Sequence, residues 1–304
     1  MKTRIFTLAF LTISLSLSAQ SVSFVNLSPD ARTMGLAGAT IALDANAYAL
    51  YTNPAAMALS NQKMAAGVSY MQWQPNATDG QLVSASGFGK IGQKFAVGLA
   101  GRYLNMPSYT ISTGEGNLNG TYKPAEYAVE LGAAYQLAKG LSIGINARFI
   151  QSSLSDNYKD NAFAADVALQ YQIKHFSVAA AVTNLGQPMD FGMKQKLPTL
   201  AKLGVAYSLP IAEGHRVSFS VEGDYHLTYH KGFMGGVGLE YAFKNWVAVR
   251  AGYHLGDELK TIPSYATVGL GFQIAGVSLE GAYIFTGADS PLKNSFSATL
   301  GYRF

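Results

Sequence analysis

A period of two in hydrophobic and polar positions runs through the chain from residue 93 to its end. In each run, one set of positions carries no Asp, Glu, Lys or Arg, while the other set carries small residues and single charges. The first clear run alternates Phe95, Val97, Leu99, Gly101 and Tyr103 with Lys94, Ala96, Gly98, Ala100 and Arg102. Strict alternation of this kind is typical of a β-strand with two different faces.

The pattern predicts fourteen strands, each about ten residues long, which is the length that a tilted strand needs to cross a bilayer. The first two are less cleanly two-faced than the others. The predicted strands are 64–74, 80–88, 93–104, 126–136, 140–151, 161–173, 175–184, 199–209, 215–227, 233–243, 246–255, 264–274, 276–286 and 295–304.

The links between these strands are alternately short and longer from the second link onward. Lys174 and Ala275 are single-residue links, whereas the longest link spans 105–125. Short periplasmic turns and longer outer loops are the rule in outer-membrane barrels. An even number of strands then places both ends of the sheet on the periplasmic side.

Composition decides which face of each strand meets lipid. Charged residues make up only 13% of the chain, which is too few to solvate the outside of a soluble sandwich. After residue 20 no apolar run approaches the 18 residues of a membrane helix, so a chain that spans the membrane must close into a barrel. The sequence therefore predicts an all-β membrane protein, a fourteen-stranded antiparallel outer-membrane β-barrel whose apolar face contacts outer-membrane lipid.

The first nineteen residues have the layout of a secretory signal peptide. Lys2 and Arg4 precede an apolar stretch, and small residues end at Ala19, so we place the cleavage after that residue. With no cysteine in the chain, neither lipidation after cleavage nor a disulfide is available. The expected location is the outer membrane, reached by export.

Residues 20–63 do not show the strand pattern, and they are too apolar for a disordered linker. Gly35 and Gly38 permit close backbone approach or a positive φ. Asn53 precedes Pro54 and is therefore restricted to an extended or turn conformation. Pro54 can then open a short helix that starts at Ala55.

This segment resembles the amino-terminal segment of the FadL-like outer-membrane proteins, and more narrowly the PorV/PorQ family of Bacteroidetes. The resemblance is carried by Ser28-Pro29-Asp30-Ala31-Arg32-Thr33-Met34-Gly35, by Asp44-Ala45-Asn46-Ala47 and by Asn53-Pro54-Ala55. It implies a fourteen-stranded barrel, 64–304, with residues 20–63 folded inside as a plug or hatch. The plug motif that it marks consists of Gly35, Gly38, Asp44, Asn53, Pro54 and Ala55.

The resemblance also implies a function, with alternatives left open. PorV-type members act with the type IX secretion system and capture cargo, so secretion-system proteins or exported cargo are the expected partners. FadL itself takes up hydrophobic molecules through an opening in the wall, which makes a transporter with a hydrophobic ligand the second hypothesis. Gly98 and Gly101 could mark such an opening. The third hypothesis is an enzyme that modifies outer-membrane lipid.

The inward positions carry a charge network of both signs. Two interpretations remain, a mutually neutralised lumen that holds the plug and a pore whose charges select ions. The predicted network consists of Arg102, Glu130, Arg148, Asp166, Arg216, Glu222, Arg250 and Glu280.

No pattern indicates a catalytic site, a cofactor or a metal. His226 and His230 are four residues apart, but no carboxylate or cysteine pattern reinforces a metal site. No Gly-x-Ser-x-Gly elbow is present, so we expect a protein that is not an enzyme. Basic residues are scattered singly, which excludes a nucleic-acid interface.

Overall fold

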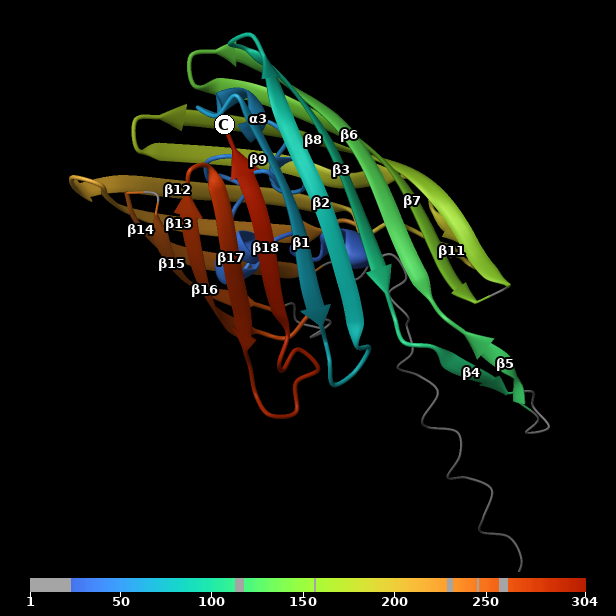
Figure 1. Cartoon of the computed structure of the whole chain (residues 1–304). Helices are drawn as coiled ribbons and strands as arrows, with labels where there is room; N and C mark the ends of the chain where they lie inside the picture. The colour runs from blue at the N-terminus through green and yellow to red at the C-terminus, as the bar shows by residue number, and fades with distance from the viewer. Residues whose placement is uncertain (1–22, 113–117, 156, 229–231, 245, 257–261) are drawn as a thin grey trace, which may run out of the picture.

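Fourteen antiparallel strands close into a single barrel in which β1 lies next to β18 (Figure 1). The computed structural model describes residues 23–304 except 113–117, 156, 229–231, 245 and 257–261. The predicted fourteen-stranded barrel is confirmed. The predicted signal peptide, 1–19, lies outside the described residues and stays a prediction. No helix in the described part of the chain is long and apolar enough to cross a membrane.

The elements follow one another in the order of the sequence. Four short helical turns come first, namely η1 (Ser23–Asn26), α1 (Ala31–Gly35), α2 (Ala49–Thr52) and α3 (Ala56–Leu59). The barrel strands are β1 (Met64–Trp73), β2 (Gly80–Ile91), β3 (Phe95–Asn105), β6 (Ala125–Ala138), β7 (Leu141–Ser155), β8 (Tyr158–Ile173), β9 (Phe176–Gly186), β12 (Leu200–Ala212), β13 (His215–His226), β14 (Phe233–Phe243), β15 (Val247–Leu255), β16 (Tyr265–Ile274), β17 (Val277–Phe285) and β18 (Phe296–Arg303). Outside the barrel, β4 (Tyr109–Ser112) pairs with β5 (Leu118–Tyr122), and β10 (Met189–Asp190) pairs with β11 (Lys194–Gln195).

The pleat places the apolar positions outside and the small and charged positions inside. In β3, Leu99 is 62% exposed on the outer face, whereas Ala96 and Arg102 on the inner face are buried. Side chains on the outer face of a membrane barrel meet lipid, so their exposure is the expected state of apolar residues there. The inner face is buried because the barrel is filled.

The two ends of the barrel differ in their links. At the end that we call the short-turn end, β2–β3, β6–β7, β8–β9, β12–β13, β14–β15 and β16–β17 are joined by two or three residues. Both ends of the sheet lie here, since the Met64 backbone N–H donates to the Phe304 carbonyl at 3.1 Å. The opposite end carries the longer links, and we call it the long-loop end. The exception there is the link between β7 and β8, which has only two residues because both strands extend into the predicted loop 152–160. By the usual arrangement of such barrels, the short turns face the periplasm.

The long-loop end is raised on one side. Strands β6, β7 and β8 are 14, 15 and 16 residues long, whereas β15 and β17 have 9 residues each. The sequence pattern did not predict β4 and β5, which form a hairpin that projects beyond this side of the barrel (Figure 1). The hairpin is short and outside lipid, so its residues had no need of the alternation that marks the barrel strands.

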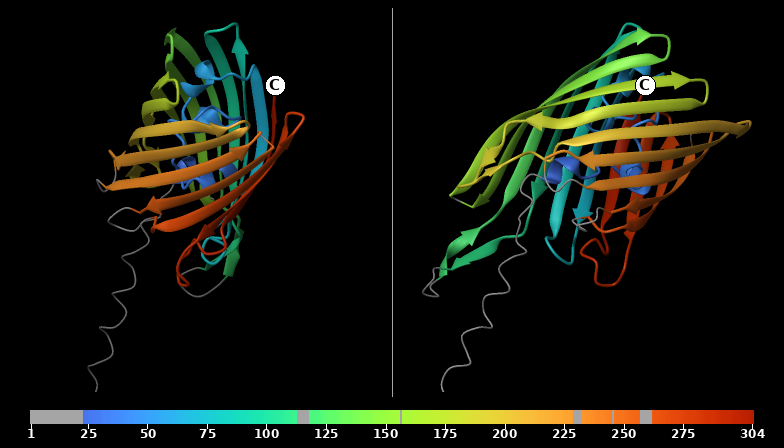
Figure 2. Two further views of the ribbon diagram at one scale, coloured as in Figure 1. Left: turned by 90° about the vertical axis from the view of Figure 1, so that its left-hand side faces the viewer. Right: turned by 180° about the vertical axis from the view of Figure 1, so that it is seen from behind.

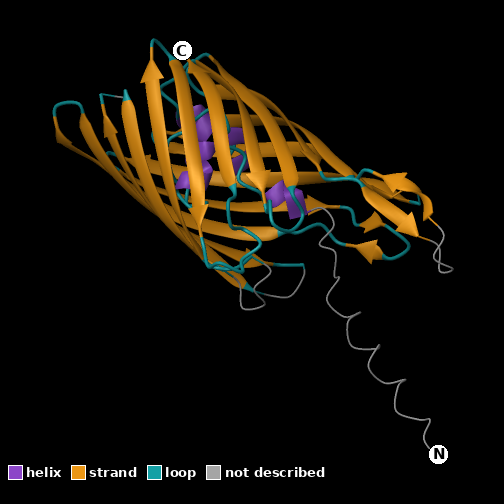
Figure 3. Cartoon of the chain, turned by 60° about the horizontal axis from the view of Figure 1, so that its bottom comes forward, coloured by secondary structure: helices purple, strands orange, loops and turns teal. Residues whose placement is uncertain are grey.

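Residues 23–63, which we call the interior segment, lie within the barrel (Figures 2 and 3). The segment begins near the long-loop end, where Phe24 packs in a cluster with Leu82 and Leu104. It ends at the short-turn end, where the Lys63 backbone N–H donates to the Phe304 carbonyl at 2.7 Å. The segment therefore follows the length of the barrel before the first strand starts.

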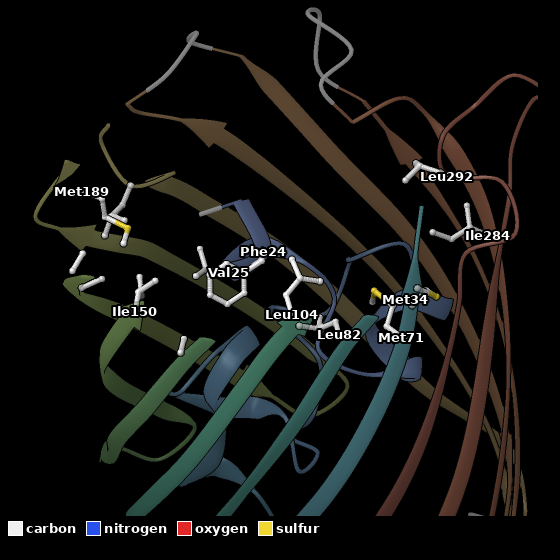
Figure 4. Close-up of a cluster of buried hydrophobic side chains, with 14 of the residues drawn as sticks. Phe24, Val25, Met34, Met71, Leu82, Leu104, Ile150, Met189, Ile284 and Leu292 are labelled. Atoms are coloured by element: carbon white, nitrogen blue, oxygen red, sulfur yellow. The ribbon is translucent and has the colours of Figure 1, made fainter. Parts of the chain in front are cut away.

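An apolar cluster fills the barrel towards the long-loop end (Figure 4). Its side chains come from the interior segment, from opposite walls and from the long links. They include Phe24, Val25, Met34, Met71, Leu82, Leu104, Ile150, Met189, Ile284 and Leu292. Close packing of this kind leaves apolar side chains out of water without the need for lipid contact.

Glycines on the inner wall make room for the interior segment. A Cβ on Gly144 would lie 2.3 Å from the Ala55 nitrogen, and one on Gly204 would lie 2.3 Å from Ile41 Cγ2. A Cβ on Gly236 would lie 2.5 Å from the Ala37 carbonyl oxygen. These distances are shorter than any real contact, so the segment can approach the wall this closely only where the wall has no side chain.

Candidate functional site

Charged side chains from adjacent strands form a buried cluster near the middle of the β3–β8 wall. Glu130 on β6 lies between two arginines, with its Oε1 2.9 Å from Arg148 Nε and 3.6 Å from Arg102 Nε. Arg148 Nη2 also lies 2.9 Å from Asp166 Oδ2. Asn146 donates to Glu130 at 2.6 Å and to Asp166 at 3.0 Å. We call these residues the outer cluster. Because buried charges are costly unless they are paired, their mutual contacts are what allows them inside.

The outer cluster holds the start of the interior segment. Arg102 Nη1 donates to the carbonyls of Phe24 and Val25 at 3.2 and 2.9 Å. Asn184 Nδ2 donates to the Asn26 side-chain oxygen at 2.8 Å. The Arg102 guanidinium also lies 4.0 Å from the centre of the Tyr51 ring, a distance typical of a cation–π contact.

Asn184 occupies an irregularity in the wall. The β8–β9 register shifts between Ala165 and Val167, and Asn184 has a φ of 58°. Its backbone N–H donates to the Asp166 carboxylate at 2.7 Å, and its side-chain oxygen accepts from Arg148. The bulge thereby links the wall to the outer cluster.

A second cluster, the inner cluster, lies towards the short-turn end. Glu240 Oε2 is 3.1 Å from Arg32 Nε and 2.7 Å from Arg250 Nε. Arg250 Nη1 reaches Glu280 at 2.6 Å. Arg216 joins the same carboxylate, with Nη2 3.4 Å from Glu240 Oε1. Arg32 belongs to α1, so this cluster binds the interior segment to β13–β17.

Glu222 caps a turn of the interior segment. Its Oε2 accepts from the backbone N–H groups of Thr40 and Ile41 at 2.9 and 2.8 Å, and its Oε1 lies 2.7 Å from Lys202 Nζ. Two backbone donors and one cation thus satisfy a carboxylate that is 4% exposed. The eight charged residues predicted for the lumen are therefore distributed over the outer cluster, the inner cluster and this turn.

The residues of the predicted plug motif each have a structural role. Gly38 has a φ of +86°, which favours glycine. A Cβ on Gly35 would lie 3.2 Å from the Gly269 Cα on β16. Asp44 lies 3.3 Å from Arg216.

Asn53 fixes the turn that precedes Pro54. Its side-chain oxygen accepts from the Ala55 backbone N–H at 3.0 Å, while its Nδ2 donates to the Ile41 carbonyl at 2.7 Å and to Gln170 at 2.8 Å. Pro54 is followed by α3, and the Ala55 carbonyl accepts from Ser142 at 2.9 Å.

A cavity of about 830 Å³ lies between the interior segment and the wall at the short-turn end. Its lining includes six cationic and four carboxylate side chains, together with amides. The charged lining residues are Asp30, Arg32, Asp44, Lys139, Lys174, Arg216, Glu240, Arg250, Glu280 and Arg303. A lining of this composition is suited to polar ligands and water.

Sequence reasoning did not single out several residues that hold the interior segment. Arg32 joins the inner cluster, and Asn184 joins the outer one. The wall glycines Gly144 and Gly204 were assigned no role, although their parity along the strand places them on the inner face, a signal that could have found them.

Two weaker candidates gain nothing from the structure. Of the predicted histidine pair, His230 lies outside the described residues. The described residues hold no group of three His, Cys, Asp or Glu side chains that could bind a metal. The second candidate is the wall opening that Gly98 and Gly101 suggested. At both glycines β3 pairs with β2 and β6 in continuous register, so the strand pairing gives this opening no support.

Solved structures of similar fold include two toluene transporters and a FadL homologue, and their likeness shows the fold alone. The toluene transporter TbuX of Ralstonia pickettii has a TM-score of 0.63 and 13% identity, covering 91% of this chain and 97% of its own. The toluene transporter TodX of Pseudomonas putida has a TM-score of 0.62 and 12% identity, covering 89% and 96%. A FadL homologue of Pseudomonas aeruginosa has a TM-score of 0.54 and 12% identity, covering 91% and 99%.

Sequence comparison identifies the family. No curated protein is significantly similar to the chain. The family model described as type IX secretion system protein PorV, in contrast, matches residues 15–228, which include the whole interior segment and the strands from β1 to β13. With the closed barrel and its filled lumen, this match shows that the chain belongs to the PorV family of outer-membrane β-barrel proteins.

Proposed function

We propose that this barrel is a non-catalytic component of type IX protein secretion that contacts secretion-system proteins or exported cargo at its long-loop end. The observation that carries the proposal is the PorV family match over residues 15–228. Export by the signal peptide 1–19 and insertion of 64–304 as the membrane barrel are part of the same proposal.

The raised side of the long-loop end supports a docking role. The β4–β5 hairpin is braced against the barrel, because the Tyr109 hydroxyl donates to the Leu154 carbonyl at 2.6 Å and the Tyr122 hydroxyl lies 2.5 Å from Ser153 Oγ. Lys159 Nζ on β8 lies 5.6 Å from the Tyr122 ring centre. A two-stranded hairpin held in a fixed position presents free backbone edges, which are sites at which an extended partner can add a strand.

We further propose that residues 20–63 act as a plug. The described part, 23–63, is held by ion pairs and hydrogen bonds on several sides of the wall, including Arg32 to Glu240 and Thr40 to Glu222. Each such contact would have to break before the segment could leave. A segment anchored in this way supports a barrel that serves as a rigid platform.

The test is deletion of the gene in the source organism, followed by comparison of the surface and secreted proteomes. We expect cargo to accumulate in the periplasm and complementation with the full-length chain to restore its release. A variant in which residues 106–124 are replaced by a short Gly-Ser linker should insert into the membrane but fail to restore release. Lys293→Gln, which alters an exposed residue in a different long link, is the control. Unchanged proteomes in the deletion strain would refute the proposal.

A transporter of hydrophobic molecules is the second candidate, and the likeness of the fold to TbuX and TodX favours it. It predicts that the deletion strain takes up radiolabelled toluene more slowly while its secreted proteome stays normal. The charged lining of the cavity at the short-turn end is a poor environment for such a ligand, because an apolar molecule there would desolvate ionised groups without pairing them. Unchanged lipid A and phospholipid profiles in the same strain would exclude the third hypothesis, a lipid-modifying enzyme.

A further inference from the structure

The cavity at the short-turn end has the size of a ligand site. Its volume of about 830 Å³ lies within the range of roughly 300–1,000 Å³ that is usual for sites that bind small molecules. One side is formed by the interior segment and the rest by wall residues of β13–β18, β1, β6 and β8. The inner cluster joins the interior segment to the wall beside the cavity. The remaining question is which chemistry the lining would recognise.

The lining carries more positive than negative side chains, six against four. The four carboxylates already have partners within the protein. Glu240 and Glu280 pair with arginines of the inner cluster, and Asp44 pairs with Arg216. Asp30 caps α1 by accepting from the Thr33 backbone N–H at 3.3 Å and also accepts from Asn46 at 2.7 Å.

Arg303 is different from the other arginines of this cavity. It lies on β18 beside the cavity and donates to the amide oxygen of Gln273. Among the described residues, no carboxylate lies within ion-pair distance of it, in contrast to Arg32, Arg216 and Arg250. A guanidinium presents a planar fork of donors that matches a carboxylate.

Neutral hydrogen-bonding groups complete the lining. Asn46, Gln136 and Gln172 border the same cavity as Arg303. Amide side chains both donate and accept hydrogen bonds, so they suit the polar backbone of an organic anion.

We propose that this cavity binds a small polar organic anion that enters from the short-turn end, with its carboxylate on Arg303 and its further polar groups on the amide side chains of the lining. The ligand class is a carboxylate on a hydrogen-bonding backbone, as in a short acidic peptide or an oligouronate. The proposal is independent of the role in secretion, since it concerns the opposite end of the barrel from the hairpin.

The test uses the full barrel in non-ionic detergent and isothermal titration calorimetry. The anionic probes are N-acetylated triglutamate and trigalacturonate, which distinguish a peptide from a sugar source, and N-acetylated triglutamine is the uncharged control. We expect at least one anionic probe to bind and the control not to. Arg303→Gln should weaken that binding about ten- to a hundredfold, the usual effect of losing a charge-assisted hydrogen bond.

Two controls separate binding from folding. The melting temperature of Arg303→Gln, measured in the same detergent, shows whether the variant is folded. Lys293→Gln removes one positive charge at the long-loop end and should leave binding unchanged. The proposal is overturned if neither anionic probe binds at millimolar concentration, if triglutamine binds equally well, or if Arg303→Gln binds as tightly as the wild type.

Discussion

Removal of the central carboxylate of the outer cluster should destabilise the barrel and release the start of the interior segment. Glu130 is fully buried and faces Arg102, Arg148 and Asn146. Glu130→Gln keeps the shape of the side chain and removes its charge. The effect therefore measures the ion pairs and not the packing.

The magnitude follows from what remains after the substitution. Arg148 keeps Asp166 at 2.9 Å, whereas Arg102 loses its carboxylate and retains the carbonyls of the interior segment. Loss of one partner from a buried pair costs about 3–5 kcal/mol because a charge is left uncompensated. Since one arginine stays paired, we expect the lower end, about 3 kcal/mol, which is roughly a hundredfold in the unfolding equilibrium.

The assay is urea unfolding of the detergent-solubilised barrel, followed by the shift between compact and unfolded bands on a gel. A local readout uses the absence of cysteine from the chain. Val25→Cys is added both to the otherwise unchanged protein and to the Glu130→Gln variant. Maleimide should label this cysteine slowly in the first protein, because Val25 is 5% exposed and its carbonyl is held by Arg102, and faster in the second. Glu213→Gln, at an exposed site in the β12–β13 turn, is the control.

The result that would refute this reasoning is a change in unfolding free energy no larger than that of Glu213→Gln. A second check is the double variant Glu130→Gln with Arg102→Leu. Removing the orphaned arginine should restore part of the loss, since the two residues are in contact. If the double variant is less stable by the sum of the two single losses, the charge of Arg102 is not the cause.

Three further substitutions test the contacts that hold the interior segment in place. Gly204→Ala should cost about 1–3 kcal/mol in urea unfolding because its Cβ would lie 2.3 Å from Ile41, whereas Gly101→Ala, with 3.7 Å to its nearest neighbour, should change little. Asn53→Ala should lower the unfolding free energy by about 1–3 kcal/mol in the same assay, because it leaves buried backbone groups without hydrogen bonds. If Val25→Cys is labelled equally fast with Asn53 and with Asn53→Ala, the disturbance is confined to the turn at Asn53. Arg216→Gln should lower the unfolding free energy by less than about 1 kcal/mol, since the ion pairs of Arg216 are partly solvated. About 0.5 M salt should abolish the difference. A loss as large as that of Glu130→Gln would contradict this explanation.

The barrel could be predicted from sequence because every strand repeats one physical requirement. Leu99, Leu131 and Leu279 all lie at lipid-facing positions, and the lipid-facing set of each predicted strand excludes Asp, Glu, Lys and Arg. Alternation also assigned each residue to a face of the sheet, and it placed Glu130 and Arg148 on the inner face. The ends of β6 to β8 extend beyond the prediction because strand pairing continues outside the membrane, where lipid no longer selects the residues.

The path of the interior segment could not be predicted in this way. It depends on contacts between residues far apart in the sequence, such as the Glu222 carboxylate with the Thr40 and Ile41 backbone. No local pattern encodes such a pairing. The parity of Gly144 placed it on the inner face, but which backbone would fill the space beside it is decided by the tertiary structure.

The position of the interior segment has a consequence for how the barrel is assembled. The segment precedes β1, and the barrel is closed by pairing of β1 with β18, the last strand of the chain. Its contacts reach β7 at Gly144, β12 at Gly204 and β14 at Glu240. A segment enclosed on all these sides cannot be inserted through a finished wall, so we expect it to be in place before the seam closes and to serve as a template on which the sheet curls.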